Sequence, residues 1–185
     1  MDVRDTSIAG LKIIRSRYFE DERGYFAETF KAHAFAAAGL PSGFVQDNHS
    51  LSREVGTLRG MHWQTAPSAQ AKLVRVLHGR VLDIVVDLRR DSPTFRQHLA
   101  VELSAENRLQ LMVPRGFAHG FLTLEADSEV FYKVDAPYDA VAERGLHWTD
   151  PDLALPWPDT PEVRVVSAKD QAWPRWRDMP TPYAD

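Results

Sequence analysis

The chain has 185 residues, a length that suits one domain, and 44% of them are hydrophobic, enough for a sizeable core. Its formal net charge of −4 argues against nucleic acid or an anionic membrane as its main partner. The absence of cysteine excludes disulfides, zinc–thiolate sites, iron–sulfur clusters and cysteine nucleophiles.

We expect a cytoplasmic protein. No apolar run reaches the roughly 20 residues that a membrane helix needs. Residues 1–10 lack the basic segment and apolar stretch of a secretory signal.

Turn residues and hydrophobic patterning predict short strands and one early helix. The helix covers residues 30–38 and is ended by Gly39 and Pro41. The segment His78-Gly79-Arg80 is typical of a hairpin turn between two strands. The tail after Asp150 is rich in Pro and Trp, and we expect it to pack on the sheet in short turns or helices. The predicted strands are 72–77, 81–88, 97–103, 108–113, 117–124 and 129–134.

This succession of short strands favours an antiparallel sandwich or barrel. Nothing in it alternates strand and helix as a parallel α/β fold would. The chain also lacks GxGxxG and GxxxxGK[ST], which argues against a dinucleotide-binding dehydrogenase and a P-loop enzyme.

Two histidines lie in segments that contain more polar and charged residues than the core of a β-sandwich requires. His62 is either a general base or a buried histidine held by one hydrogen bond. His119 follows Pro114 and Gly116 with the Pro-x-Gly-x-x-His spacing that resembles the second cupin motif. The first cupin motif of metal-binding members has His-x-His and then Glu, whereas this chain has His-Trp-Gln at 62–64 and no Glu in the next ten residues. We therefore predict a cupin fold without a metal ion.

Three further residues have two interpretations each. Lys72 is an edge lysine with its amine in solvent, or a cation inside the barrel that stabilises negative charge on oxygen. The alternation around Asp83 does not decide whether it faces solvent or a pocket. Tyr132 is a core tyrosine or a proton donor aimed into a cavity.

The chain resembles the dTDP-4-dehydrorhamnose 3,5-epimerase family from about Ile8 to Asp170. Short matching stretches follow one another in the family's order. They are 23–28 (RGYFAE), 46–50 (QDNHS), 58–64 (LRGMHWQ), 72–76 (KLVRV), 92–95 (SPTF), 103–108 (LSAENR), 114–121 (PRGFAHGF), 129–133 (EVFYK), 143–145 (ERG), 148–153 (WTDPDL) and 167–170 (SAKD).

The resemblance implies an all-β cupin-type double-stranded β-helix, or jelly roll, with a few short helices. It implies one domain over 1–185, with N-terminal strands and a Pro/Trp-rich C-terminal tail. It also implies a homodimer with no metal and no organic cofactor. The implied activity is inversion of C3 and C5 of dTDP-4-dehydro-6-deoxy-D-glucose on the route to rhamnose.

The resemblance also implies residue roles. His62 matches the base, Asp170 its paired carboxylate, and Tyr132 the acid on the opposite face. Lys72 would hold the enolate oxygen, with Asp83 as its neighbour. The remaining matches are predicted to bind substrate. Arg59 and His119 match residues around the sugar and diphosphate, and Tyr138 matches the aromatic residue on thymine. The nucleotide-side matches are Arg23, Glu28, Gln46, Asp47, Asn48, Glu143 and Lys169, and Phe26 is a further substrate-binding match.

Two features depart from the family pattern. Many members have two adjacent aromatic residues where this chain keeps only Tyr138. The segment Trp173-Pro174-Arg175-Trp176 lies outside the shared pattern and has no functional interpretation from sequence.

The sequence is also compatible with other functions. A monoepimerase or a ketoisomerase would share the fold and much of the site. A metal-dependent cupin enzyme and a non-catalytic sugar-binding cupin are the more distant alternatives.

Overall fold

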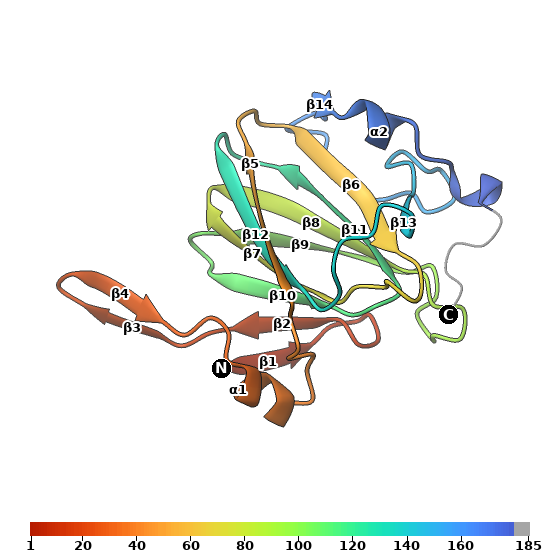
Figure 1. The fold of residues 1–185 in the computed structure, drawn as a ribbon. Coiled ribbons are helices and arrows are strands. Elements are labelled where there is room, and N and C mark those ends of the chain that lie inside the picture. Colours follow the sequence, from red (N-terminus) through yellow and green to blue (C-terminus); the bar gives the residue numbers. More distant parts are fainter. Residues whose placement is uncertain (180–185) are drawn as a thin grey trace.

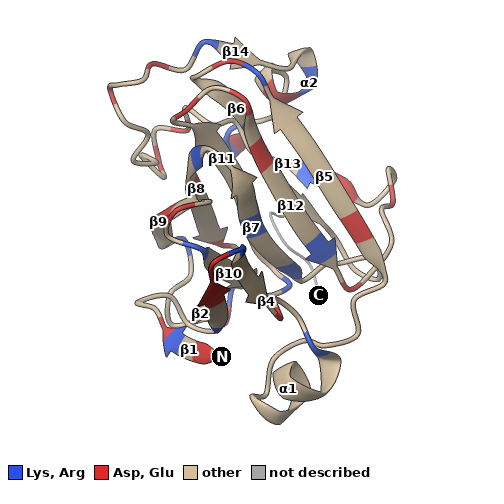
Figure 2. Ribbon diagram, turned by 90° about the vertical axis from the view of Figure 1, so that its left-hand side faces the viewer, with Lys and Arg blue, Asp and Glu red and all other residues tan. Residues whose placement is uncertain are grey.

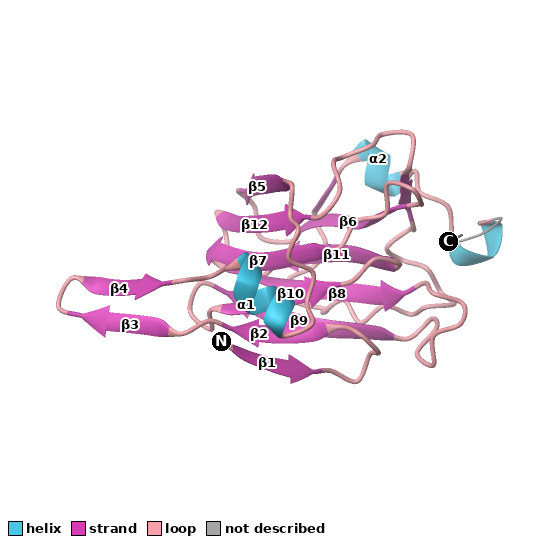
Figure 3. Cartoon of the chain, turned by 60° about the horizontal axis from the view of Figure 1, so that its bottom comes forward, coloured by secondary structure: helices cyan, strands magenta, loops and turns pink. Residues whose placement is uncertain are grey.

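A computed structural model describes residues 1–179, so the last part of the predicted domain and tail, 180–185, lies outside the described residues. Strands dominate and the helices are short (Figure 3). In chain order the elements are β1 (Asp2–Asp5), β2 (Lys12–Arg15), β3 (Tyr18–Asp21), β4 (Gly24–Ala27), α1 (Ala32–Ala37), β5 (Gln46–Ser52), β6 (Thr57–Gln64), β7 (Lys72–His78), β8 (Arg80–Asp87), β9 (His98–Ser104), β10 (Leu109–Val113), β11 (Phe117–Thr123), β12 (Ser128–Val134), β13 (Glu143–Gly145), β14 (Val165–Val166), α2 (Ala168–Gln171) and the 3-10 helix η1 (Trp176–Asp178).

Two antiparallel sheets form the body of the molecule. The first has the strand order β1-β2-β10-β7-β12-β5, and the second has the order β13-β6-β11-β8-β9, with β14 pairing in parallel with β6. The predicted jelly roll is confirmed by this arrangement of facing sheets (Figure 1). No helix in the described part of the chain is long and apolar enough to cross a membrane.

Apolar side chains from both sheets fill the space between them. Val74 and Leu111 from the first sheet meet Val85 and Phe121 from the second. A second cluster, with Ile84 and Val86, lies on the other face of β8. Both faces of β8 are therefore buried, which is why its alternation alone could not tell which face Asp83 shares.

The C-terminal tail covers that other face of the second sheet. Leu153 is buried in the second cluster, and Trp157 and Trp176 pack against it. The expectation that the tail packs on the sheet in short turns or helices is confirmed in part, because the tail also contributes the strand β14, which was not predicted. This packing brings α2 to the end of β6 (Figure 1).

Most predicted elements match the structure to within two residues, but one turn was wrong. The helix predicted over 30–38 is α1, which packs through Phe35 on the outer face of the first sheet. The segment at Gly79 is not a hairpin turn, because β7 belongs to the first sheet and β8 to the second. Val76 and Val81 both face the core between the sheets, so the chain changes sheet at Gly79. A sharp corner between sheets uses the same turn residues as a hairpin.

The hairpin of β3 and β4 projects from the body of the molecule (Figures 1 and 3). Three of its aromatic side chains are exposed, Phe19 by 50%, Tyr25 by 60% and Phe26 by 70%. A monomer rarely leaves so many large apolar side chains together in solvent, so this hairpin has the features of an interaction element.

Candidate active site

A cavity of ≈ 470 Å³ opens between the two sheets. Strands from both sheets line it, and the tail segment of β14 and α2 closes one side. Seven of the predicted site residues line it, namely Arg59, His62, Lys72, His119, Tyr132, Lys169 and Asp170. Local sequence placed these residues in separate segments, and the fold brings them together.

His62 and Asp170 form a hydrogen-bonded pair at 2.5 Å between Nε2 and Oδ1, across a separation of 108 residues. Asp170 is positioned by α2, where the Ser167 hydroxyl accepts its backbone N–H at 3.0 Å. Its second oxygen, Oδ2, accepts the backbone N–H of Gly60 at 3.2 Å. Because Nε2 is directed at the carboxylate, Nδ1 is the ring nitrogen left to take a proton.

The pKa of Asp170 lies below its ordinary value. Burial of the carboxyl raises this pKa, but the hydrogen bonds from His62, Gly60 and Trp173 together outweigh that effect. The carboxylate is thus ionised at neutral pH. An ionised carboxylate beside His62 stabilises the imidazolium that forms when the ring takes a proton.

Lys72 lies inside the sandwich and not at an edge. Its strand, β7, is central in the first sheet, and only 8% of the residue is exposed. Burial lowers the pKa of its ammonium to about 8, partly offset by the charges of Asp83 and Glu143. The nearest hydrogen-bond acceptor for Nζ is the carbonyl of His62 at 3.4 Å. A cation held this way is suited to stabilise negative charge that develops on a substrate oxygen.

Asp83 and His119 form a second histidine–carboxylate pair. His119 Nε2 lies 2.8 Å from Asp83 Oδ2, and both side chains are buried. The resemblance predicted that Asp83 lies beside Lys72. In the structure Asp83 acts on Lys72 through its charge, while its hydrogen bond goes to His119. The pairing follows from adjacent strands β11 and β8, which no local pattern reveals.

Tyr132 reaches the cavity from the sheet opposite His62. It lies on β12 of the first sheet, whereas His62 lies on β6 of the second. Burial raises the pKa of its hydroxyl, which the charge of Arg59 partly counters. The phenol therefore keeps its proton at neutral pH and is able to donate it.

A second hollow of ≈ 260 Å³ adjoins the cavity and shares His62, Lys72 and Tyr132 with it. Four predicted nucleotide-side residues line it, namely Gln46, Asn48, Tyr138 and Glu143. They are held to one another. Gln46 donates to Asn48 at 2.9 Å and accepts the backbone N–H of Tyr138 at 3.0 Å. The Tyr138 hydroxyl donates to Glu143 at 2.7 Å, and Lys169 pairs with the same carboxylate.

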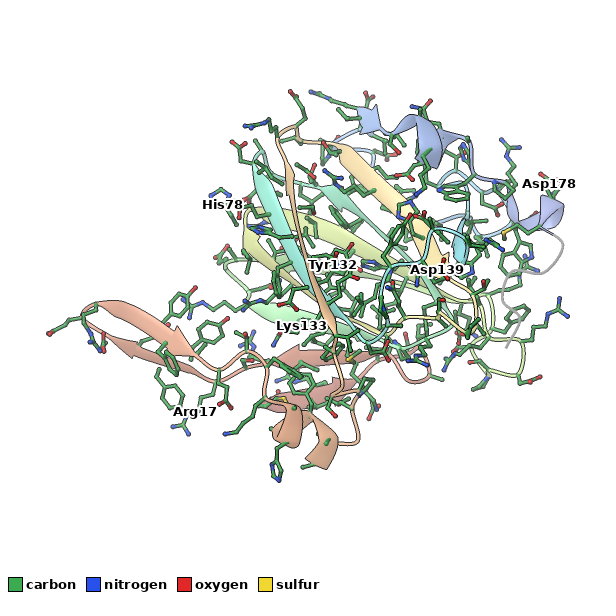
Figure 4. All side chains as sticks on the ribbon, in the orientation of Figure 1. Arg17, His78, Tyr132, Lys133, Asp139 and Asp178 are labelled. Carbon is green, nitrogen blue, oxygen red and sulfur yellow. The ribbon has the colours of Figure 1, made fainter. Side chains whose placement is uncertain are left out.

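Four predicted binding residues lie outside both hollows of this chain. Asp47 alternates with Gln46 and Asn48 along β5, so its side chain lies on the outer face, where it accepts from Lys133 at 2.7 Å. Arg23 and Phe26 belong to the projecting hairpin and Glu28 directly follows it. Figure 4 labels Arg17 at the base of that hairpin, well away from Tyr132. The role of these four residues in substrate binding stays a prediction, and within one chain they line neither of the hollows that hold the other predicted residues.

Other lining residues were missed from sequence. Ser50 lines the cavity and lies two residues beyond Asn48 on the same face of β5, a period-two signal that would have found it. Trp63, Gln64 and Gln70 line the second hollow. Val165, Val166 and Ser167 enter the cavity only because the tail folds back on β6.

Charge is mixed over the described part of the molecule, which also holds no group of side chains suited to metal binding. Acidic and basic residues are interspersed on the side shown in Figure 2. Among residues 1–179, no three His, Asp or Glu side chains are grouped as a metal site would require. His62 and His119 each bond a carboxylate through Nε2. Freedom from metal stays a prediction, which metal analysis of the purified protein would test.

Comparison with known proteins identifies close relatives. Residues 5–178 match the family model described as dTDP-4-dehydrorhamnose 3,5-epimerase. The protein of that name from Sinorhizobium fredii is 47% identical over 183 residues, covering 99% of this chain and 93% of that protein. The crystal structure from Bacillus anthracis, with TDP and PPi bound, has a TM-score of 0.90 and 45% identity, covering 94% of this chain and 98% of the other. The structure from Legionella pneumophila, in complex with dTDP-4-keto-L-rhamnose, has a TM-score of 0.92 and 41% identity, covering 100% and 98%.

Proposed function

The chain belongs to the dTDP-4-dehydrorhamnose 3,5-epimerase family, and we propose that His62, Tyr132 and Lys72 carry out its proton transfers. It is an epimerase that inverts C3 and C5 of dTDP-4-dehydro-6-deoxy-D-glucose to give dTDP-4-dehydro-L-rhamnose, for dTDP-rhamnose biosynthesis. The observation that carries the assignment of roles is the facing of His62 and Tyr132 across one cavity that also holds a buried lysine.

The first step is removal of a proton from carbon. Nδ1 of His62 takes the proton next to the C4 ketone, and the electron pair of the C–H bond moves onto the C4 oxygen as an enolate. Asp170 holds the ring and stabilises the imidazolium. Lys72 stabilises the enolate oxygen, since its ammonium is already buried and little reorganisation is needed.

The second step returns a proton from the other face. Tyr132 donates its hydroxyl proton to the same carbon, and the enolate electrons form the new C–H bond. The phenolate then regains a proton from solvent and the His62 imidazolium releases its proton to solvent, which resets the pair. Donation from the face opposite His62 inverts the centre, whereas return of the proton by His62 would restore it. Rotation of the sugar in the cavity presents the second carbon to the same pair. Base, cation and acid all come from the chain, so we expect no cofactor.

Deuterium labelling tests this function. Incubation of the enzyme with dTDP-4-dehydro-6-deoxy-D-glucose in deuterated water is expected to place deuterium at both C3 and C5, as read by NMR of the product. Label at C3 alone would instead indicate a monoepimerase. Absence of label at both carbons would reject epimerisation.

A homodimer would supply the binding residues that the single chain lacks at its own cavity. Arg23 and Phe26 extend away from the body on an exposed aromatic hairpin. We infer that the hairpin of one copy reaches the site of the second copy and places these residues against the nucleotide. A two-fold dimer exchanges the same element in both directions, so both sites would be completed.

Mixed dimers test this exchange. A variant with Arg23→Ala and Phe26→Ala and a variant with His62→Ala are each expected to be inactive. Co-expression with different tags should restore about one quarter of wild-type activity per chain, because random pairing gives one complete site in half of the dimers. Mixing His62→Ala with Asp170→Asn is the matched control and should restore nothing, since both changes affect the same core. Equal activity in the two mixtures would contradict the exchange.

A further inference from the structure

Trp173 lies next to the catalytic pair although nothing in the sequence gave it a role. It lies two residues after the end of α2, and the chain that follows it is fixed by two hydrogen bonds. The Pro174 carbonyl accepts the backbone N–H of His147 at 2.9 Å, and the Trp176 N–H donates to Asp150 at 2.7 Å. The tail is thereby fastened beside β6 and β13, so the indole has a defined position.

The indole lies flat against Gly145 of β13. A Cβ at Gly145 would lie 2.2 Å from two ring carbons of Trp173 and 2.4 Å from its Nε1, so any side chain there would displace the ring. Gly145 is the register partner of His62 on the neighbouring strand. Because Gly145 has no side chain, the indole has room to lie beside His62, the proposed base.

The ring contacts the catalytic pair in two ways. Its Nε1–H donates to Asp170 Oδ1 at 3.3 Å, the same oxygen that bonds His62 Nε2. The ring also stands edge-on to the imidazole, with centroids 6.2 Å apart and an interplanar angle of 69°. A second donor on one carboxylate oxygen limits rotation of the carboxyl group, and the ring edge limits rotation of the imidazole.

We infer that Trp173 is a positioning residue that acts through Asp170 and holds His62 as the Nε2–H tautomer, with Nδ1 facing the cavity. The inference rests on the proposed function of the pair. Without the indole N–H, Asp170 keeps its bond from the Gly60 N–H, but its carboxyl group gains freedom to turn away from His62 Nε2. Substrate binding would change little, because Trp173 lines neither hollow.

The test compares Trp173→Phe with Trp176→Phe. Trp173→Phe keeps a ring against Gly145 and removes the N–H, and we expect kcat to fall about tenfold with KM within about twofold. Trp176 packs on Phe95 and under Arg96, away from the pair, so its variant should retain wild-type kcat. Gly145→Ala should lower kcat in the wild-type background and have no further effect in Trp173→Ala.

A spectroscopic measurement separates this inference from the proposed function. Nitrogen-15 NMR of labelled histidine should show His62 protonated at Nε2 in the wild type and a mixture of tautomers in Trp173→Phe. An unchanged tautomer, wild-type kcat in Trp173→Phe, or an equal loss in Trp176→Phe would overturn the positioning role. Wild-type protein inactive on dTDP-4-dehydro-6-deoxy-D-glucose would reject the proposed function, while the NMR comparison would still decide the role of Trp173.

Discussion

Replacing His62 with alanine is expected to lower kcat by about 10³ to 10⁴, because the reaction loses the proposed general base. Deuterium incorporation from solvent should cease at both C3 and C5. Binding of dTDP, measured by calorimetry, should persist, since the nucleotide-side residues of the second hollow are untouched. Full exchange in this variant would remove His62 as the base.

Two comparisons strengthen this experiment. His33→Ala changes an exposed histidine on α1 and should leave the rate unchanged. Asp170→Asn should also lower kcat strongly, and the double variant should be no slower than His62→Ala alone, because groups that act as a unit give non-additive losses. Additive losses would mean that Asp170 acts independently of His62.

Replacing Lys72 with methionine is expected to remove activity and to stabilise the protein. The enolate loses its buried cation, so kcat should fall by about 10² to 10³. The free energy of unfolding at pH 7 should rise by roughly 1–3 kcal/mol, because the folded state no longer has to bury a charged ammonium. The remaining Asp83 carboxylate keeps its bond to His119, which limits the opposing loss.

The sign of the pH dependence follows from the lowered pKa of Lys72. The pKa of Lys72 in the folded protein, about 8, lies below the ordinary lysine value of 10.5. Below pH 8 the Lys72 amine is protonated in both the folded and the unfolded state, and burial of its charge lowers the free energy of unfolding. Between about 8 and 10.5 the unfolded state binds more protons, so stability rises with pH and the destabilisation is removed. The same loss of charge should lower wild-type kcat above about pH 8.

Denaturation curves and rate profiles across pH check both effects. The stability gap between wild type and Lys72→Met should be largest below pH 8 and should close toward pH 10.5. Lys31→Met, an exposed lysine, serves as control and should show no such gap. A less stable Lys72→Met protein at pH 7, or a retained rate, would contradict the proposed role of a buried cation.

The projecting hairpin holds predicted binding residues whose own site the sequence of one chain does not identify. The sequence brought Arg23, Phe26 and Glu28 into the binding set through resemblance, yet the fold carries this segment away from its own cavity. A sequence match predicts that a residue belongs to a binding site. It does not tell whether that site lies in the same chain or in a second copy. The mixed-dimer experiment addresses that question.

Local patterning alone predicted the six strands β7 to β12, and with the motif spacings it indicated a cupin without the usual metal ligands. These signals are short-range, since side chains alternate along each strand and turn residues act within a few positions. Sequence also selected His62, Lys72, Tyr132 and Asp170 as chemical candidates. The first three also had a purely structural interpretation, as a buried histidine, an edge lysine and a core tyrosine.

Only the tertiary structure decided how those residues meet. It turned the expected hairpin at Gly79 into a change of sheet, and it placed Lys72 in the interior because β7 is central. It joined Asp83 to His119, and it brought Asp170 and Trp173 to His62 across more than a hundred residues. Pairing of strands and docking of the tail depend on contacts between distant segments, so no local periodicity encodes them, and on β8 the burial of both faces erased even the local signal.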